Sequence, residues 1–175
     1  MKSLWANIFQ KDTEGEESII SILRKIPIFS ELSRRELEAI QHILHQRTYR
    51  KGEVIFRQGD AGVGMYIIEK GTVLIRLEPY GQIVAELHDG EFFGELALLD
   101  DSPRSASAIA GTDCRMLGFF QPDLFGLIER NPRLGVKIVL KLAQVIGERL
   151  KAANRENQEM RKHLQELEEK VGAQS

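Results

Sequence analysis

The sequence has few of the features that fix a chain covalently or hold it in a membrane. Its 175 residues include one cysteine, Cys114, five prolines and one tryptophan. A single cysteine excludes an intrachain disulfide and is typical of proteins in a reducing compartment. No apolar run approaches the roughly 20 residues that span a bilayer, and the first residues are too short and polar for a secretory signal. The sequence therefore predicts a cytoplasmic protein.

An excess of one charge is also lacking. The chain has 24 Lys and Arg against 26 Asp and Glu, a formal charge of −2. This balance gives no attraction for nucleic acid or for an anionic membrane, so neither is expected as a partner.

Catalytic chemistry has no visible basis either. A metal-dependent β-fold enzyme would need clustered ligands, usually two or three histidines with a carboxylate. The four histidines are instead spread over different segments: His42, His45, His88 and His163. We therefore predict no metal site, no catalytic residue and no cofactor, and a protein that is not an enzyme.

The chain does contain three stretches of different character. Residues 1–18 predict a tail and linker, residues 19–133 one folded unit, and residues 134–175 a long helix. Between positions 47 and 120, short runs of Val, Ile, Tyr and Phe are separated by regularly spaced glycines. This alternation of short apolar runs and glycines predicts a mainly β sandwich or roll, with helices before and after it.

Local signals add detail inside the folded unit. Ser33 and Glu36 have the spacing of a capping box at a helix start. Strand-like runs at residues 72–77 and 82–87 flank Pro79-Tyr80-Gly81 and predict a hairpin. Cys114 lies in a strand-like context without a neighbouring base, so we interpret it as a buried structural thiol.

The long helix carries an apolar heptad repeat. Asn157 falls at one of its core positions, where a buried polar residue favours a parallel two-stranded coiled coil. In this register Glu156 faces Arg161 of the partner. We therefore predict a parallel homodimer, and the alternative is a helix that folds back on its own domain. The core positions are Val136, Val139, Ala143, Ile146, Leu150, Ala153, Asn157, Met160, Leu164, Leu167 and Val171.

The segment at residues 92–107 combines an apolar run with groups suited to a phosphate and a sugar. Gly94 allows close approach of backbone to a ligand, and the residues after it can form a short helix. Arg104 offers a planar set of donors for a phosphate, and Glu95 offers an acceptor for a sugar hydroxyl. The alternative is a surface turn with a structural Glu–Arg pair.

Several motifs stand out over residues 26–155, namely Gly52-Glu53, Gln58-Gly59-Asp60, Tyr66-Ile67-Ile68, Gly71, Phe93-Gly94-Glu95-Leu96 and Pro103-Arg104-Ser105-Ala106. Together they resemble the motifs of the cyclic nucleotide-binding domain family. The family includes the catabolite activator protein, regulatory subunits of cAMP-dependent protein kinase, and cyclic nucleotide-gated channels. The resemblance implies a jelly-roll-like β-roll with N-terminal helices and a long C-terminal helix.

The same resemblance implies roles for individual residues. Glu95 would accept from the ribose 2′-hydroxyl, Arg104 would pair with the cyclic phosphate, and Ser105 would donate from backbone and hydroxyl. The backbone of Gly94 and Leu96 would hold the ribose phosphate. Ala106 belongs to the matching Pro-Arg-Ser-Ala motif. Ile75, Val84 and Ala85 match family positions that face the base.

On the long helix, the family pattern places Ala153 and Asn154 over the base and Arg149 near Glu95 as a latch. Ala153 lacks the hydroxyl that family activators use to bond an adenine. The Ser105 hydroxyl resembles one that contacts guanine in cGMP-binding relatives. The expected ligand is a cyclic nucleotide, with cAMP favoured over cGMP.

These observations predict a non-enzymatic cyclic nucleotide sensor that signals through the C-terminal helix of a dimer to an unknown downstream protein. The family's transcription factors carry a helix-turn-helix domain after this helix, and the present sequence has no such domain, so DNA binding is not expected. Two alternatives stay open. One is a structural or scaffolding dimer with a degenerate pocket, and the other is a cGMP-selective sensor.

Overall fold

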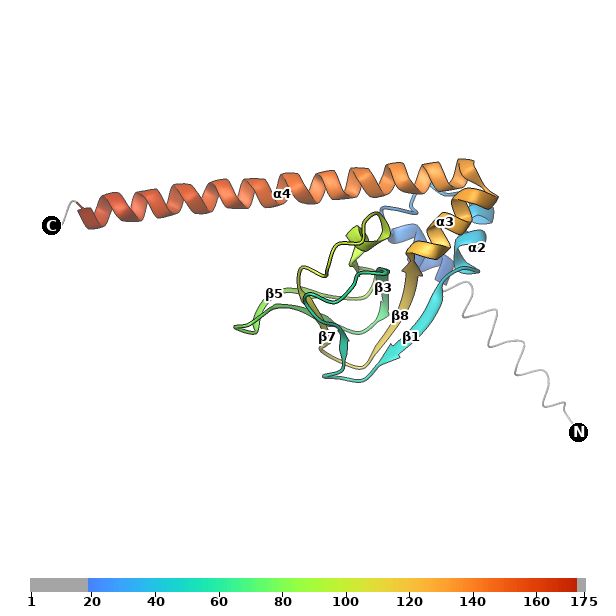
Figure 1. The fold of residues 1–175 in the computed structure, drawn as a ribbon, viewed down its shortest axis with the longest axis horizontal. Helices are drawn as coiled ribbons and strands as arrows, with labels where there is room; N and C mark the ends of the chain where they lie inside the picture. Colours follow the sequence, from blue (N-terminus) through green and yellow to red (C-terminus); the bar gives the residue numbers. More distant parts are fainter. Residues whose placement is uncertain (1–18, 173–175) are drawn as a thin grey trace, which may run out of the picture.

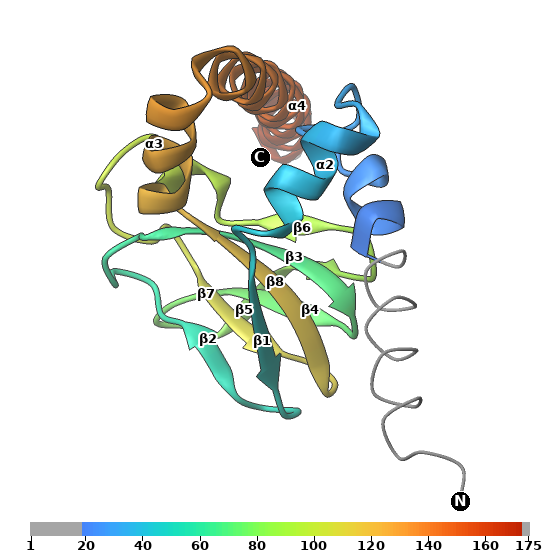
Figure 2. The same ribbon diagram turned by 90° about the vertical axis from the view of Figure 1, so that its right-hand side faces the viewer.

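Two antiparallel sheets form a roll, and helices cover one end of it (Figures 1 and 2). The computed structural model describes residues 19–172, so the predicted tail and linker at residues 1–18 lie outside the described residues. The predicted fold class, a β-roll with flanking helices, is confirmed.

The first sheet has the strand order β1-β8-β3-β6 and the second the order β2-β7-β4-β5. In neither sheet do the strands lie in the order in which they follow one another along the chain, as expected when strands alternate between two sheets of a roll. The strands are β1 (His45–Tyr49), β2 (Val54–Phe56), β3 (Gly64–Lys70), β4 (Val73–Leu77), β5 (Gln82–Leu87), β6 (Phe92–Phe93), β7 (Ser107–Ala110) and β8 (Cys114–Phe120).

The helices on the N-terminal side are short. Residues 19–25 are helical, and α2 (Arg34–Gln41) follows. The predicted capping box is confirmed: the Glu36 N–H donates to Ser33 Oγ at 3.3 Å, and the Ser33 N–H donates to Glu36 Oε2 at 2.8 Å. Leu37 and Ile40 on the inner face of α2 are fully buried.

The predicted hairpin joins β4 to β5 around Pro79-Tyr80-Gly81 and is confirmed. Its ladder contains a bulge, because Ile75 pairs with Ala85 whereas the next residue, Arg76, pairs with Ile83. Val84 is therefore the extra residue of β5 and is about half exposed.

Buried apolar side chains form two clusters. One lies between the helices and the first sheet, and includes Leu23, Phe29, Phe119 and Leu142. The other fills the roll between the two sheets. Cys114 belongs to the second cluster, is 3% exposed and makes no disulfide, so its prediction as a buried thiol is confirmed.

Two helices follow the roll. The first is α3 (Gln121–Arg130), and α4 (Pro132–Gly172) begins two residues later, slightly before the predicted start at 134. The Leu134 N–H donates to Asn131 Oδ1 at 3.3 Å, so Asn131 caps α4 and Pro132 takes its first position. None of the described helices has both the length and the apolarity that a membrane span requires.

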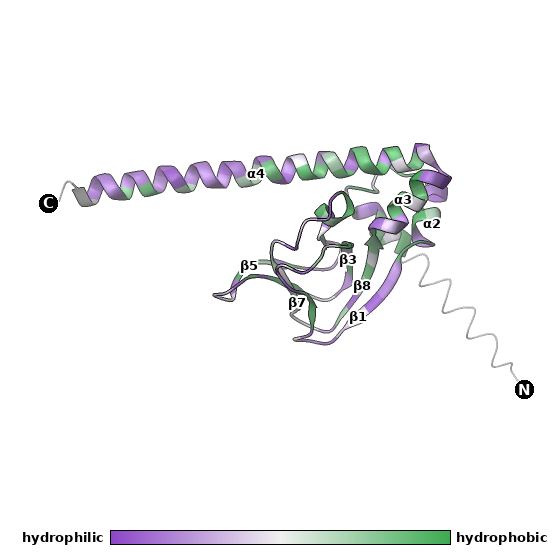
Figure 3. Cartoon of the chain, viewed as in Figure 1, coloured by the Kyte–Doolittle hydropathy of each residue, from purple (hydrophilic) through white to green (hydrophobic). Residues whose placement is uncertain are grey.

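The start of α4 packs on the domain, and its later part extends away from the roll (Figure 1). Leu134, Ile138, Leu142 and Val145 are buried against the core. Lys137 Nζ lies 2.7 Å from Glu36 Oε1, which ties α4 to α2. From Leu150 to Lys170 the helix is exposed on all sides and mainly hydrophilic, with scattered apolar side chains (Figure 3).

Two members of the predicted heptad row pack on the domain itself. Val139 and Ile146 are partly buried against the domain's own core, because the core-facing side of α4 in its first turns is wide enough to include them. The neighbouring Leu140 is instead 60% exposed. Other members of the row are exposed, namely Val136, Leu150, Met160, Leu164 and Leu167.

Candidate functional site

A cavity of about 540 Å³ opens between the second sheet, the η1 turn (Glu95–Leu98) and α4. Its size is within the 300–1,000 Å³ of small-molecule sites. The lining is mainly apolar, and its charged residues are Glu95, Asp100, Arg104 and Arg149. It consists of Phe56, Ile75, Ala85, Leu87, Phe92, Phe93, Gly94, Glu95, Leu96, Ala97, Asp100, Ser102, Pro103, Arg104, Ser105, Ala106 and Arg149.

Gly94 is the residue that turns the chain into this site. Its φ of +78° is left-handed, and only glycine adopts that conformation without strain. A Cβ at this position would lie 2.6 Å from Arg104 Nη1. Glycine is therefore required both by the backbone turn and by the arginine packed against it. The residues after Gly94 form one 3-10 turn, in agreement with the predicted short helix.

Arg104 is buried at the base of the cavity, with 8% of its surface exposed. Its Nη1 donates to the Gly94 carbonyl at 3.2 Å and its Nη2 to the Gly64 carbonyl at 2.7 Å. Nε is buried and has no hydrogen-bond partner within residues 19–172. Among the same residues, no carboxylate lies within ion-pair distance of the guanidinium.

This arrangement leaves a cation with unused donors. Burial lowers the pKa of Arg104, partly offset by Tyr66, Asp60 and Glu95, but an arginine side chain stays protonated in proteins. A buried cation without a bonded anion is costly. An anion that entered the cavity would supply the missing charge and accept from Nε.

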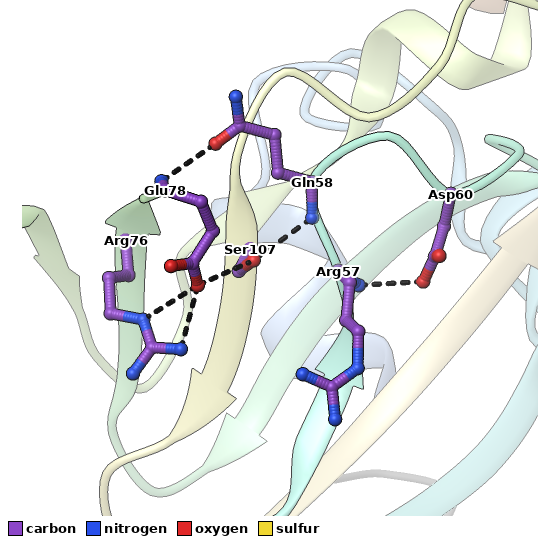
Figure 4. Close-up of polar contacts among 6 residues, drawn as sticks. All are labelled: Arg57, Gln58, Asp60, Arg76, Glu78 and Ser107. Carbon is purple, nitrogen blue, oxygen red and sulfur yellow. Dashed lines mark hydrogen bonds and ion pairs between the residues drawn. The ribbon is translucent and has the colours of Figure 1, made fainter. Parts of the chain in front are cut away.

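The backbone of Arg104 is held by the turn between β2 and β3. The Gly59 N–H donates to the Arg104 carbonyl, and the Arg104 N–H donates to the Asp60 carbonyl, each at 2.8 Å. The turn is closed by its own side chain, because the Arg57 N–H donates to Asp60 Oδ2 at 2.7 Å (Figure 4). The Gln58-Gly59-Asp60 motif therefore fixes the position of the Arg104 backbone.

A second set of bonds fixes the start of β7. The buried Ser107 hydroxyl accepts from the Gln58 N–H at 2.9 Å and lies 3.5 Å from Glu78 Oε1. Gln58 Oε1 accepts from the Glu78 N–H at 2.9 Å, and Arg76 Nη2 donates to Glu78 at 2.7 Å. Figure 4 shows Ser107 between Gln58 and Glu78. These contacts join the residues that follow β2 and β4 to the start of β7.

Glu95 and Arg149 form a bridge between the η1 turn and α4. Arg149 Nη1 lies 2.8 Å from Glu95 Oε1, and Nη2 donates to the Phe92 carbonyl at 3.2 Å. The guanidinium also stacks on the Phe92 ring, 4.5 Å from its centroid. Glu95 is 6% exposed, so Arg149 is the cation that compensates a buried carboxylate. The expected proximity of Arg149 to Glu95 is confirmed.

The structure brings most of the predicted site residues to the cavity. Those that line it are Ile75, Ala85, Gly94, Glu95, Leu96, Arg104, Ser105, Ala106 and Arg149. Their roles toward a ligand stay predictions.

Three predicted residues are not part of the cavity lining. Val84 is displaced by the bulge in β5, so Ala85 and Leu87 form that wall instead. Ala153 and Asn154 lie on the exposed part of α4, which continues as one helix past the roll and does not bend over the cavity. In this conformation neither residue lines the cavity, and their base-capping role stays a prediction.

The aromatic residues of the site were not predicted. Phe56 and Phe92 each place a ring against an arginine of the cavity. A Phe-Phe pair directly before Gly94 was visible in the sequence, but only the fold shows that Arg149 packs on its first ring. Within residues 19–172, no three His, Cys, Asp or Glu side chains gather in a way that could hold a metal ion.

Comparison with known proteins agrees with this geometry. The family model for the cyclic nucleotide-binding domain matches residues 46–131. This chain belongs to the cyclic nucleotide-binding domain family. The match covers the whole roll and α3, including the η1 turn and the Arg104 segment.

Individual relatives match a larger share of the chain than the family model does. The cyclic AMP receptor protein of Thermus thermophilus is 38% identical over 133 residues, which cover 74% of this chain and 60% of that protein. The cAMP-dependent protein kinase type II regulatory subunit of Drosophila melanogaster is 37% identical over 124 residues, 70% of this chain and 32% of that one. The chain thus spans less than two thirds of these relatives.

Solved structures show the same fold. A cyclic nucleotide-binding domain from Methylobacillus flagellatus has a TM-score of 0.68 and 26% identity, and the alignment covers 78% of each chain. The catabolite activator protein of Thermus thermophilus has a TM-score of 0.66 over 74% of this chain and 61% of that one, at 38% identity.

Proposed function

We propose that this cyclic nucleotide-binding domain is a non-enzymatic sensor of a cyclic nucleotide, with cAMP as its ligand. The observation that carries the proposal is the buried Arg104, in a cavity that also contains Glu95. Among residues 19–172, its Nε–H has no hydrogen-bond partner and no carboxylate is bonded to it. A cyclic phosphate carries one negative charge and would match one arginine. A ribose hydroxyl would donate to the Glu95 oxygen that Arg149 does not occupy.

The choice of cAMP is supported by the names of the relatives, a cyclic AMP receptor protein and a cAMP-dependent kinase subunit. The apolar wall of Ile75, Ala85 and Leu87 offers stacking area for either purine. One observation favours cGMP: Ser105 lines the cavity, and its hydroxyl is able to accept from a guanine amino group.

A titration panel tests the proposal. A ligand selective for the folded state raises the unfolding temperature, so cAMP should give the largest rise, cGMP a smaller one, and 5′-AMP none. Differential thermal unfolding followed by calorimetry measures these effects. A larger rise with cGMP would make the chain a cGMP sensor. No response to either cyclic nucleotide would favour a scaffolding role with a degenerate pocket.

We also infer that the signal leaves through α4 of a parallel dimer. In this division, residues 19–133 bind the ligand and residues 134–175 dimerise. The inference is supported by the row of exposed apolar side chains on α4, with Asn157 within it, on a side that the domain core does not cover. Because Arg149 joins the same helix to Glu95, a ligand at Glu95 would act on the helix that forms the dimer.

We therefore expect cAMP binding and dimerisation to be thermodynamically linked. Sedimentation equilibrium should show a dimer whose dissociation constant changes with cAMP, and by the same factor dimerisation should change the affinity for cAMP. Arg149→Gln should leave a dimer but reduce this factor to near one. Arg155→Gln, at an exposed position beyond the cavity, is the matched control and should behave as wild type.

The two parts of this inference fail in different ways. A wild-type protein that stays monomeric contradicts the dimer. A dimer whose dissociation constant ignores cAMP, or an Arg149→Gln variant with unchanged linkage, contradicts the coupling through Arg149.

A further inference from the structure

Phe56 lies directly against the guanidinium of Arg104. The Cζ atom of Arg104 is 4.1 Å from the centre of the Phe56 ring. Cations within about 6 Å of a ring face are attracted by its negative quadrupole, and most strongly where water is excluded. Since Arg104 is only 8% exposed, water is largely excluded and the attraction between the guanidinium and the ring is strong.

A bulge in β2 places the ring there. Val54 pairs with Ile109, and Phe56 pairs with Ala108, the residue just before Ile109 in the antiparallel strand β7. Ile55 is therefore an extra residue in β2. Bulges change the direction of the side chains that follow them. Phe56 lines the cavity, at the end of a strand that leads into the turn holding the Arg104 backbone.

Other aromatic residues hold the ring in place. The centre of the Phe56 ring lies 6.2 Å from that of Tyr66 and 5.8 Å from that of Phe93. Tyr66 and Phe93 stack on one another at 5.7 Å. Tyr66 and Phe93 belong to the buried cluster inside the roll, and the partly buried Phe56 packs against it. The packing of these three rings therefore holds the Phe56 ring in place against Arg104.

We propose that Phe56 is a positioning residue for the anion-binding arginine, which deepens the proposed function and rests on it. A ring face stabilises the cation without using any of its N–H donors. A carboxylate in the same place would accept from two donors and cancel the charge. With Phe56 below and the Gly64 and Gly94 carbonyls beside it, Arg104 keeps both its charge and its Nε–H for a phosphate.

The binding test compares three substitutions. Phe56→Leu should weaken cAMP binding about five- to tenfold, as expected for loss of a buried cation–π contact. Phe56→Tyr keeps the ring face and should stay within about twofold of wild type. Phe120→Leu is the matched control, because Phe120 touches Tyr66 in the same cluster but does not line the cavity. Calorimetry measures all three.

A second measurement needs no ligand. Nitrogen NMR of the free protein reports rotation about the Nε–Cζ bond of Arg104, which is slow when the guanidinium is held. This rotation should become at least tenfold faster in Phe56→Leu, and should be unchanged in Phe56→Tyr and Phe120→Leu. Amide spectra of each variant establish that the fold is intact.

The outcomes separate this inference from the proposed function. Unchanged rotation in Phe56→Leu overturns the positioning role, and so does an affinity loss in Phe56→Tyr as large as that in Phe56→Leu. A wild-type protein that binds no cyclic nucleotide overturns the proposed function, while the rotation measurement still decides whether Phe56 holds the arginine.

Discussion

Arg104→Ala is expected to weaken cyclic nucleotide binding by at least tenfold. Hydrogen bonds to charged groups contribute about 1.5–3 kcal/mol each, and about 1.4 kcal/mol corresponds to a factor of ten in affinity. The expected loss is large because residues 19–172 offer no second cation that bonds at the same point, since Arg149 is engaged with Glu95. Isothermal calorimetry with cAMP gives the dissociation constants.

Two further variants make this result specific. Arg57→Ala removes the same type of side chain from an exposed position in the neighbouring turn, and its affinity should equal that of wild type. Arg104→Lys keeps the charge but not the planar set of donors, so its affinity should lie between those of wild type and Arg104→Ala. An unchanged dissociation constant in Arg104→Ala would refute the assignment of this cavity as the nucleotide site.

Gly94→Ala should abolish measurable binding and also destabilise the fold. The left-handed backbone at φ +78° costs a non-glycine residue about 1–2 kcal/mol. In addition, the new Cβ would lie 2.6 Å from Arg104 Nη1 and would force the guanidinium out of position. Thermal unfolding measures the first effect and calorimetry measures the second.

Gly90→Ala separates these two effects. Gly90 has a similar φ of +81°, but a Cβ there would meet nothing within 4 Å. This variant should lose comparable stability and keep its affinity for cAMP. Equal affinities in Gly94→Ala and Gly90→Ala would mean that the contact between Gly94 and Arg104 has no part in binding.

Much of the fold could be predicted from the sequence, because its signals are local. The capping box at Ser33 and Glu36, the hairpin at Pro79-Tyr80-Gly81 and the short helix after Gly94 each depend on a few adjacent residues. Such signals act through backbone conformation and near-neighbour hydrogen bonds, which tertiary packing does not change. The proximity of Arg149 to Glu95 came from the family pattern and not from a local signal.

The errors concern register and packing between distant segments. A bulge in β5 removed Val84 from the cavity wall, and a bulge in β2 aimed Phe56 into it. A bulge depends on the partner strand, so one sequence does not reveal it. Val139 was counted in the dimer row because the heptad pattern does not show how wide the core-facing side of α4 is.

The position of Arg149 within α4 has a mechanical consequence. Arg149 is the point at which the helix touches the cavity, and 23 residues follow it to Gly172. At 1.5 Å per residue this part of the helix is a rigid arm of about 35 Å. A tilt of about 10° about the Arg149 contact would move the far end by about 6 Å. In the proposed coupling, the bridge to Glu95 is the pivot of α4, and a small shift at the cavity would become a larger displacement at the far end of the helix.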